Sequence, residues 1–183
     1  MWKIISFLFI TAIIVYISRA SLRVPPSHGF YRFFAWEFML ALFLLNVDFW
    51  FYKPLAWYQL IGWILLFASL IPLIFGVRML TSRGQPTANR ATDPSLLAFE
   101  KTTRLVTSGI YKYIRHPLYS SLFLLTWGIF FKHISVTAII LAVAVTVFLV
   151  FTAKADEAEC IQFFGAEYQD YMKHSKRFIP FLF

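Results

Sequence analysis

The chain has few charged residues and lacks the motifs that build cofactor sites in soluble proteins. Only 14% of its 183 residues are charged, against about 25% in an average soluble domain. The seven glycines stand at least eight positions apart, which excludes the glycine-rich loops that bind nucleotides. The single cysteine, Cys160, cannot form an intramolecular disulfide, and the four histidines follow no zinc-binding spacing, so we expect no metal site.

Apolar residues are correspondingly abundant. They make up 60% of the chain, and aromatic residues alone make up 20%. A single small core cannot bury that much apolar surface, so we expect the protein to lie in lipid. Charged residues delimit five apolar segments, which lie between Lys3 and Arg19, Arg32 and Lys53, Lys53 and Arg78, Arg115 and Lys132, and Lys132 and Lys154. The sequence therefore predicts an all-α integral membrane protein with about five transmembrane helices.

The five segments differ in length. Pro54 to Val77 contains 24 residues without a charge, a helix of about 36 Å that exceeds a hydrocarbon core of about 30 Å. His116 to Phe131 contains only 16 such residues. The last two spans are therefore expected either to cross independently or to form a tight hairpin that turns at Lys132 and His133.

The distribution of positive charge predicts the orientation in the membrane. With five crossings, one side carries three Lys and Arg residues and the other carries fourteen. The positive-inside rule then places the N-terminus outside and the C-terminus in the cytoplasm, at the plasma membrane in a prokaryote. A removable signal peptide over residues 1–20 is the alternative, but it would place Arg19 and Arg23 outside. Because topology accounts for the net charge of +8, we expect membrane lipids as partners and no nucleic acid.

The order of segments suggests one domain with four parts. Residues 1–77 form three N-terminal spans, 78–115 a cytosolic loop, 116–153 a helical hairpin and 154–183 a cytosolic C-terminal segment interrupted by Gly165. The long loop is interpreted as a lid or pocket wall, since long ordered connections are usually functional. The apolar end, residues 178–183, is expected to return to the membrane surface.

Two polar clusters mark a candidate site. Arg115 and His116 precede Pro117, which suits the first turn of a helix, and cations at this positive helix end indicate a shared bound anion. The alternative is that Arg115 anchors the span to lipid headgroups. The last span is followed by three of the nine acids in the chain, Asp156, Glu157 and Glu159. The alternative is that these acids only form a solvated helix surface.

The two clusters meet if the last two spans are antiparallel neighbours. An anion site beside an acidic pair would suit a zwitterion that also carries a cationic centre. Tyrosine faces and carboxylates both stabilise a sulfonium ion, and the tyrosines close to the clusters are Tyr111, Tyr113, Tyr119 and Tyr168.

These residues carry a family resemblance over positions 105 to 180. Leu105, Val106, Thr107, Gly109 and Tyr111, followed by Arg115, His116, Pro117 and Tyr119, resemble the LVTxGxYxxxRHPxY signature of the isoprenylcysteine carboxyl methyltransferases and their phospholipid methyltransferase relatives. Asp156, Glu157, Phe164, Gly165, Tyr168 and Tyr171 are similar to that family's EExxLxxxFGxxYxxY pattern. The resemblance implies a membrane methyltransferase that uses S-adenosylmethionine, bound at the cytosolic face by the last two spans, the preceding loop and the C-terminal segment.

The resemblance also assigns roles to individual residues. It implies that the cofactor is bound by Leu105, Val106, Tyr111, His116, Pro117, Leu118, Tyr119, Asp156 and Glu157. Arg115 and Glu157 are the candidate catalytic residues, with Arg115 holding an anionic group and Glu157 the best candidate base. A mechanism that uses only orientation and desolvation is equally compatible with the sequence.

The chain departs from the family pattern at three positions. Asp156 is one methylene shorter than the family glutamate, and Cys160 replaces a leucine. Thr152 stands where the family carries an arginine thought to orient the substrate carboxylate. We therefore expect poor turnover of prenylcysteine acids, unless Arg115 or Arg104 takes over that role.

The expected substrate is a lipophilic molecule that enters from the bilayer. Amine N-methylation of a phospholipid is the alternative reaction. A transporter or assembly subunit without catalysis is the alternative of another class, and it would give importance to Glu37 and Asp48, which helical spacing places on one side of the second span. Both acids could instead extend toward Arg32 or Lys53. The sequence leaves the oligomeric state open.

Overall fold

A computed structural model describes residues 1–85, 96–97 and 100–179 of the chain. Every regular element in those ranges is helical. The α-helices are α1 (Trp2–Ser18), α2 (His28–Asn46), α3 (Trp57–Arg83), α4 (Pro117–Phe130), α5 (Val136–Phe164) and α6 (Ala166–His174), and short 3-10 helices are η1 (Ser21–Arg23), η2 (Val47–Phe49) and η5 (Gly109–Lys112).

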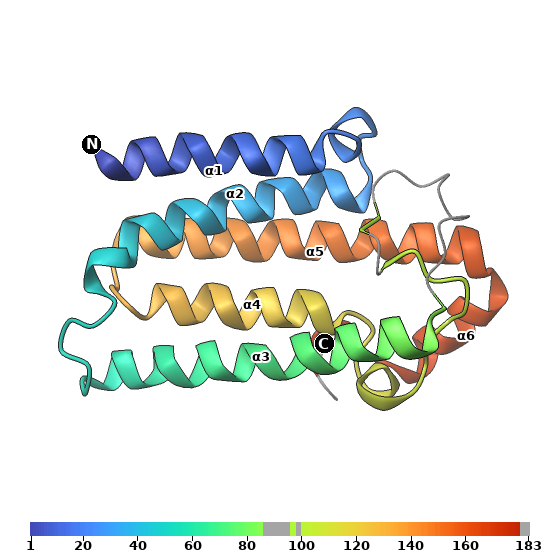
Figure 1. Cartoon of the computed structure of the whole chain (residues 1–183). Coiled ribbons are helices and arrows are strands. Elements are labelled where there is room, and N and C mark those ends of the chain that lie inside the picture. Colours follow the sequence, from blue (N-terminus) through green and yellow to red (C-terminus); the bar gives the residue numbers. More distant parts are fainter. Residues whose placement is uncertain (86–95, 98–99, 180–183) are drawn as a thin grey trace.

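Five of these helices lie side by side and alternate in direction, and α6 lies at the end of the bundle opposite the N-terminus (Figure 1). The helix starts follow from local chemistry. Ser27 caps α2 by accepting a hydrogen bond from the backbone N–H of Phe30, and Ser135 caps α5 in the same way through Ala138. Pro117 occupies the first turn of α4, where a missing N–H leaves no bond unmade.

The bundle consists of two closely packed helix pairs. One pair is α2 with α5, and the other is α3 with α4. Small residues let α3 and α4 approach each other: a Cβ on Gly62 would lie 3.1 Å from the carbonyl oxygen of Gly128, and a Cβ on Gly76 would lie 3.2 Å from Leu118 and Pro117. Close packing through small residues is typical of helices in membranes, where lipid removes the hydrophobic drive for association.

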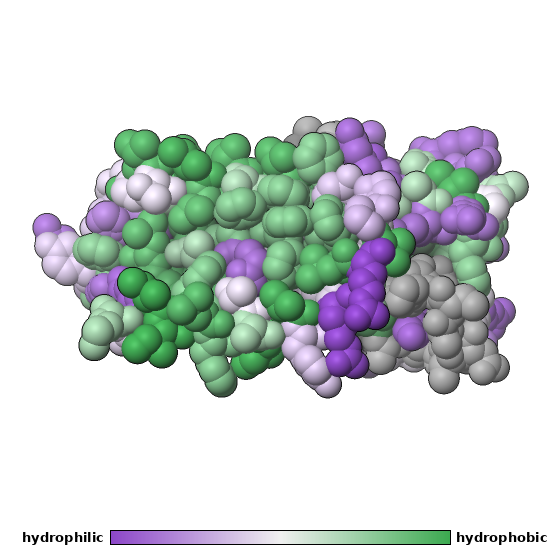
Figure 2. Space-filling view, turned by 90° about the horizontal axis from the view of Figure 1, so that it is seen from above, coloured by the Kyte–Doolittle hydropathy of each residue, from purple (hydrophilic) through white to green (hydrophobic). Residues whose placement is uncertain are grey.

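The outer surface of the bundle is apolar. Leu8 on α1, Ile64 on α3 and Val136 on α5 are 62%, 66% and 77% exposed. Figure 2 shows hydrophobic residues spread over the helices and polar residues gathered toward the ends of the molecule. Such a surface is unfavourable in water and suits a lipid environment, so the structure is consistent with the predicted membrane protein.

The helices match the predicted spans in position and differ from them in length. Three segments, His28–Phe49, Trp57–Arg83 and Val136–Phe164, are long and apolar enough to cross a membrane. Trp2–Ser18 and Pro117–Phe130 are shorter apolar helices, about 26 Å and about 21 Å long. The turn between α4 and α5 includes Lys132 and His133, as the hairpin interpretation requires. The count of five crossings stays a prediction.

The acids of the second span have other partners than the sequence suggested. Glu37 accepts a hydrogen bond of 2.7 Å from Thr11 on α1, and Asp48 forms an ion pair of 2.5 Å with Lys3. Neither contact involves Arg32 or Lys53. Both partners belong to α1 (Trp2–Ser18), so the two acids face the same neighbouring helix, although Asp48 lies in η2, beyond the end of α2 at Asn46.

Candidate functional site

The predicted site lies at the end of the bundle where α6 packs, between the start of α4 and the end of α5. α5 continues past its apolar part to Phe164, so its acids stand on a rigid helix. Gly165, with φ of +63°, then reverses the chain into α6. A second glycine with φ of +63°, Gly109, starts η5 and brings Tyr111 inward; a Cβ there would also lie 2.8 Å from the sulfur of Met79.

The C-terminal segment completes this end of the bundle. Ile114 and Lys176 form a parallel bridge, with the N–H of Arg115 donating to the carbonyl of Lys176 over 2.7 Å. The hydroxyl of Ser120 on α4 donates to the carbonyl of Phe178 over 2.8 Å. The C-terminal segment is therefore hydrogen-bonded both to the residues just before α4 and to α4 itself.

Glu157 is the centre of a buried charge cluster. Its carboxylate accepts hydrogen bonds from Arg115 Nε at 2.9 Å and, in a two-pronged arrangement, from Arg177 Nε at 3.1 Å and Nη2 at 2.7 Å. Arg115 also donates to the carbonyl oxygens of Met172 and Ser175. Buried and multiply bonded, Arg115 and Glu157 hold the C-terminal segment to α5.

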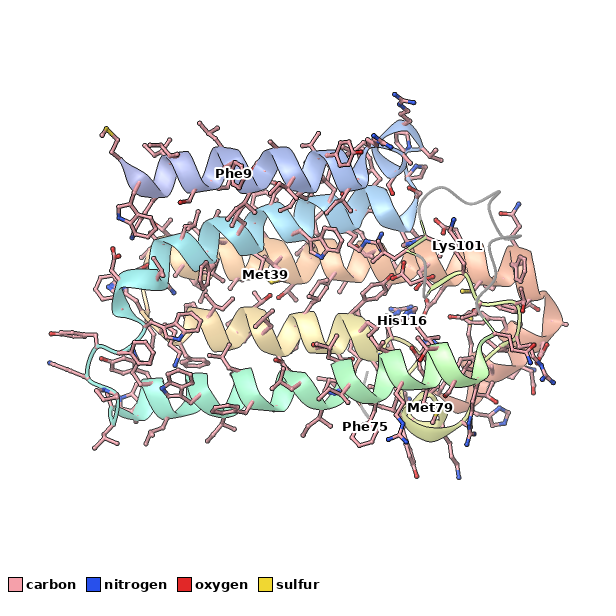
Figure 3. The ribbon with its side chains drawn as sticks, in the orientation of Figure 1. Phe9, Met39, Phe75, Met79, Lys101 and His116 are labelled. Atoms are coloured by element: carbon pink, nitrogen blue, oxygen red, sulfur yellow. The ribbon has the colours of Figure 1, made fainter. Side chains whose placement is uncertain are left out.

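His116 lies between the two neighbouring acids. Its Nδ1 is 3.3 Å from Asp156 Oδ2, and its Nε2 is 3.3 Å from Glu157 Oε1. Burial alone would lower the pKa of His116, but the hydrogen bonds to Asp156 and Glu157 outweigh burial and raise it above its usual value. The imidazolium form, which donates from both nitrogens, fits this geometry. Figure 3 shows His116 at the start of α4.

A cavity opens beside this cluster, which we call the polar cavity. Asp156 lines it and accepts a hydrogen bond of 3.2 Å from the hydroxyl of Tyr119. Burial raises the pKa of Tyr111, Tyr168 and Tyr171, so these phenols stay neutral at physiological pH and cannot serve as bases. The lining comprises Leu80, Leu96, Glu100, Thr102, Leu105, Val106, Tyr111, Arg115, His116, Pro117, Leu118, Tyr119, Asp156, Glu159, Cys160, Phe164, Tyr168 and Tyr171.

The sequence of the chain is similar to sequences of known methyltransferases. The phospholipid methyltransferase family matches residues 87–167. Methanethiol S-methyltransferase 2 of Bradyrhizobium diazoefficiens is 27% identical over 164 residues, which are 79% of this chain and 58% of that protein. Protein-S-isoprenylcysteine O-methyltransferase of Dictyostelium discoideum is 31% identical over 152 residues, which are 79% of this chain and 61% of that protein.

Over these stretches the chain is similar to the isoprenylcysteine and phospholipid methyltransferases. It spans about three fifths of the length of these two curated relatives. Methanethiol S-methyltransferase of Crocosphaera subtropica matches a shorter stretch, at 28% identity over 76 residues, which are 42% of this chain and 29% of that protein. No solved structure shows significant similarity to the chain.

The family signature residues converge on the polar cavity. Of the nine positions to which the resemblance gave a cofactor-binding role, all except Glu157 line it. Glu157 instead lies behind the wall, in the charge cluster. Tyr113, which the sequence suggested as a wall residue, is 48% exposed and outside the lining. The roles of these residues toward a cofactor stay predictions.

Sequence reasoning missed two polar pairs that connect α2 to the site. His28, fully buried at the start of α2, lies 2.5 Å from Glu159, and its backbone N–H donates to the same carboxylate over 2.9 Å. Arg32, one turn further, donates from Nη1 to both carboxylate oxygens of Glu100, at 3.0 and 2.8 Å. Both acids line the polar cavity. A signal was available: His28 and Arg32 stand one turn apart at the polar end of an apolar helix.

Thr152, the position where the family pattern has an arginine, is buried in the helix bundle. It is fully buried, and its hydroxyl donates to the carbonyl of Phe148 within α5. Arg115 is engaged with Glu157 and with backbone carbonyls. Arg115 also lines the polar cavity, so the orienting role that the sequence offered to it stays a prediction.

A second hollow lies along the bundle, which we call the apolar groove. It has a volume of about 580 Å³ and is bounded by α2, α3 and α4. Figure 3 labels Met39, one of its lining residues, on α2. The lining is Trp36, Met39, Leu40, Phe43, Trp50, Trp63, Leu66, Phe67, Ser69, Leu70, Leu125 and Ile129. Its composition suits a hydrocarbon chain.

Proposed function

We propose that this protein is a membrane methyltransferase that uses S-adenosylmethionine to methylate a lipophilic acceptor. The observation that carries the proposal is the convergence of the family signature on the polar cavity. Residues from two distant stretches, around Tyr119 and around Asp156, form one wall and are joined by a hydrogen bond. The similarity to phospholipid and isoprenylcysteine methyltransferases supports the same activity.

The chemistry of the lining suits a ligand with a cationic centre. Glu100, Asp156 and Glu159 bring carboxylates to the wall, and Tyr119 and Tyr168 bring aromatic faces. Both kinds of group attract a sulfonium ion. When bound, S-adenosylmethionine supplies an electrophilic methyl group. The cavity proper holds about 100 Å³, less than the roughly 300 Å³ of a small ligand pocket, so such a ligand would also occupy its open mouth.

The protein's own residues would contribute position and charge. Tyr119 and His116 fix the carboxylate of Asp156 at the wall, and Leu105, Val106 and Leu118 exclude water from the apolar side. The apolar groove would hold the tail of an acceptor that arrives from the bilayer. Orientation of the two reactants in a dry site is the main source of rate for a displacement of this kind.

Phospholipid amine N-methylation is the second candidate, because the matching family is described as phospholipid methyltransferase. The two candidates differ in the acceptor and share the cofactor. The similarity to methyltransferases also favours both candidates over the transporter alternative.

Calorimetry on the detergent-solubilised protein tests cofactor binding, which the two candidates share. We expect S-adenosylmethionine and its demethylated product to bind, and we expect labelled methyl groups to appear in lipid extracts or in hydrophobic thiols and acids. Absence of heat and of thermal shift with either ligand at millimolar concentration, in folded protein, would contradict the enzyme assignment and favour the transporter alternative.

A further inference from the structure

We infer that Arg32 on α2 binds the acceptor through an anionic nucleophile, a thiolate or a carboxylate. This inference rests on the proposed methyltransferase function and names the chemical class of its substrate. It starts from the position of one buried guanidinium, which is only 5% exposed and lies between the two hollows of the molecule.

Contacts on both sides define that position. Arg32 donates to Glu100, which lines the polar cavity, and the charge of Asp156 in the cavity wall also acts on Arg32. On the other side, the guanidinium lies 5.0 Å from the ring of Trp36, which lines the apolar groove. An acceptor with its tail in the groove and its reacting atom at the cavity would therefore pass its head group beside Arg32.

An incoming anion could replace Glu100 as the partner of Arg32. Both bonds to Glu100 come from one nitrogen, Nη1. Arg177, by contrast, uses two nitrogens to reach the two oxygens of Glu157, which is the stronger arrangement. Glu100 also belongs to the segment between α3 and α4 and not to one of the long helices. The carboxylate of Glu100 thus resembles a stand-in for the anionic group of a substrate.

Charge then selects the acceptor. The cavity wall carries Glu100, Asp156 and Glu159, which together repel an anion unless a cation lies nearer to it. Arg32 supplies that cation at the side from which the acceptor arrives. An anionic head group can pair with Arg32, whereas an ammonium group cannot, so contact with Arg32 favours an acid or a thiol over a lipid amine.

The transfer balances without a further reactant. The lone pair of the thiolate or carboxylate forms the new bond to the methyl carbon as the donor's sulfur–methyl bond breaks. The electron pair of the broken bond stays on the donor sulfur, which becomes a neutral thioether. A thiol first loses its proton to water, and the guanidinium stabilises the resulting thiolate.

The test compares Arg32→Gln and Arg32→Lys with the wild type and with Arg23→Gln. Arg23 is an exposed arginine near the same end of the bundle and serves as the control for loss of charge. Labelled methyl transfer is measured on dodecanethiol, N-acetyl farnesylcysteine and phosphatidylethanolamine, and cofactor binding is measured separately by calorimetry. The first two acceptors distinguish a thiolate from a carboxylate, and the third is the amine.

We expect Arg32→Gln to lower kcat/KM for the anionic acceptor roughly tenfold to a hundredfold, the loss typical of one charge-assisted bond. Cofactor affinity should be unchanged, Arg32→Lys should recover part of the activity, and Arg23→Gln should match the wild type. With a thiol acceptor, the acidic limb of the pH profile should move to higher pH in Arg32→Gln, because the thiolate loses its stabilising charge.

Glu100→Gln gives a prediction of opposite sign that does not depend on removing Arg32. If Glu100 competes with the acceptor for Arg32, the KM of the Glu100→Gln variant for the acceptor should be lower than that of the wild type. If Glu100 only tethers its segment, the variant should lose both cofactor affinity and turnover. The second result would overturn the inference, as would preferred methylation of the amine or full activity of Arg32→Gln. A wild-type protein that binds no cofactor would instead overturn the proposed function and this inference together.

Discussion

Asp156 and Glu157 are adjacent acids with different settings. Asp156 faces the polar cavity and is held by Tyr119, whereas Glu157 lies behind the wall with Arg115 and Arg177. The sequence pattern treats the two as a pair. Their substitution should therefore affect different properties of the protein.

Asp156→Asn should weaken cofactor binding while the protein stays folded. Loss of a charge-assisted contact raises the dissociation constant roughly tenfold or more. Glu157→Gln is the matched comparison, because it removes the buried carboxylate that Arg115 and Arg177 share and should lower the free energy of unfolding by roughly 3 kcal/mol. Calorimetry and thermal unfolding in detergent separate the effects. Equal losses of affinity in the two variants would contradict this division.

His116 should make stability depend on pH. Its pKa is raised in the folded protein by Asp156 and Glu157. The favourable pairing is therefore complete below the unfolded pKa and is lost as the pH rises through the folded value. We expect the unfolding temperature to fall as the pH rises above about 6.5, and His116→Gln to remove that part of the fall. His174→Gln, at the exposed end of α6, should leave the profile unchanged.

At the scale of the helices, the contact between α3 and α4 depends on glycine. A Cβ on Gly128 would lie 2.9 Å from the side chain of Leu66 and 3.0 Å from its backbone nitrogen. Because a backbone atom cannot move aside as a side chain can, α4 would have to shift away from α3.

Gly128→Leu should therefore destabilise the bundle by about 1–3 kcal/mol or more. Thermal unfolding in detergent measures the loss. Ile64→Leu is the control and should have no effect, because Ile64 lies on the lipid-facing side of α3 and is 66% exposed. An unchanged unfolding temperature in Gly128→Leu would show that the two helices can separate at little cost.

How far the sequence predicts the structure differs between local and distant features. The helix positions, the turn at Lys132 and the break at Gly165 follow from charge, apolar length and glycine, all of which are local. The signature residues around Tyr119 and Asp156 were predicted to meet, because a short turn makes their helices antiparallel neighbours.

Pairs that join distant helices were not predicted. Arg32 and Glu100 are 68 residues apart, and His28 and Glu159 are 131 apart. Their meeting depends on α2 packing against α5 instead of its chain neighbour α3, and no local pattern encodes that choice. Two apolar helices of similar length have similar hydrophobic patterns, so the sequence does not show which of them packs against α2. Charge counting alone therefore assigned Arg32 to the membrane surface and overlooked its place between two hollows.

At the scale of the whole molecule, orientation in the membrane is the open prediction. The start of α1, the end of α2 and the turn between α4 and α5 lie at one end of the bundle, and α6 lies at the other (Figure 1). The charge split places the α6 end in the cytoplasm. A reporter fused after Phe183 should be cytoplasmic, and a tag before Met1 should be accessible from outside. Both ends on one side would mean an even number of crossings, with α1 or α4 as the helix that does not cross.

The packing of α2 against α5 also has a consequence for biosynthesis. His28 and Arg32 enter the membrane long before their helix partner exists, since α5 is translated more than a hundred residues after the start of α2. Until then only α1, α3 and α4 have been made as possible helix neighbours of α2. The polar cavity is thus formed last, when the ribosome has released the C-terminal segment that bridges to Ile114. A chain arrested before that point would contain most of the membrane helices and none of the completed site.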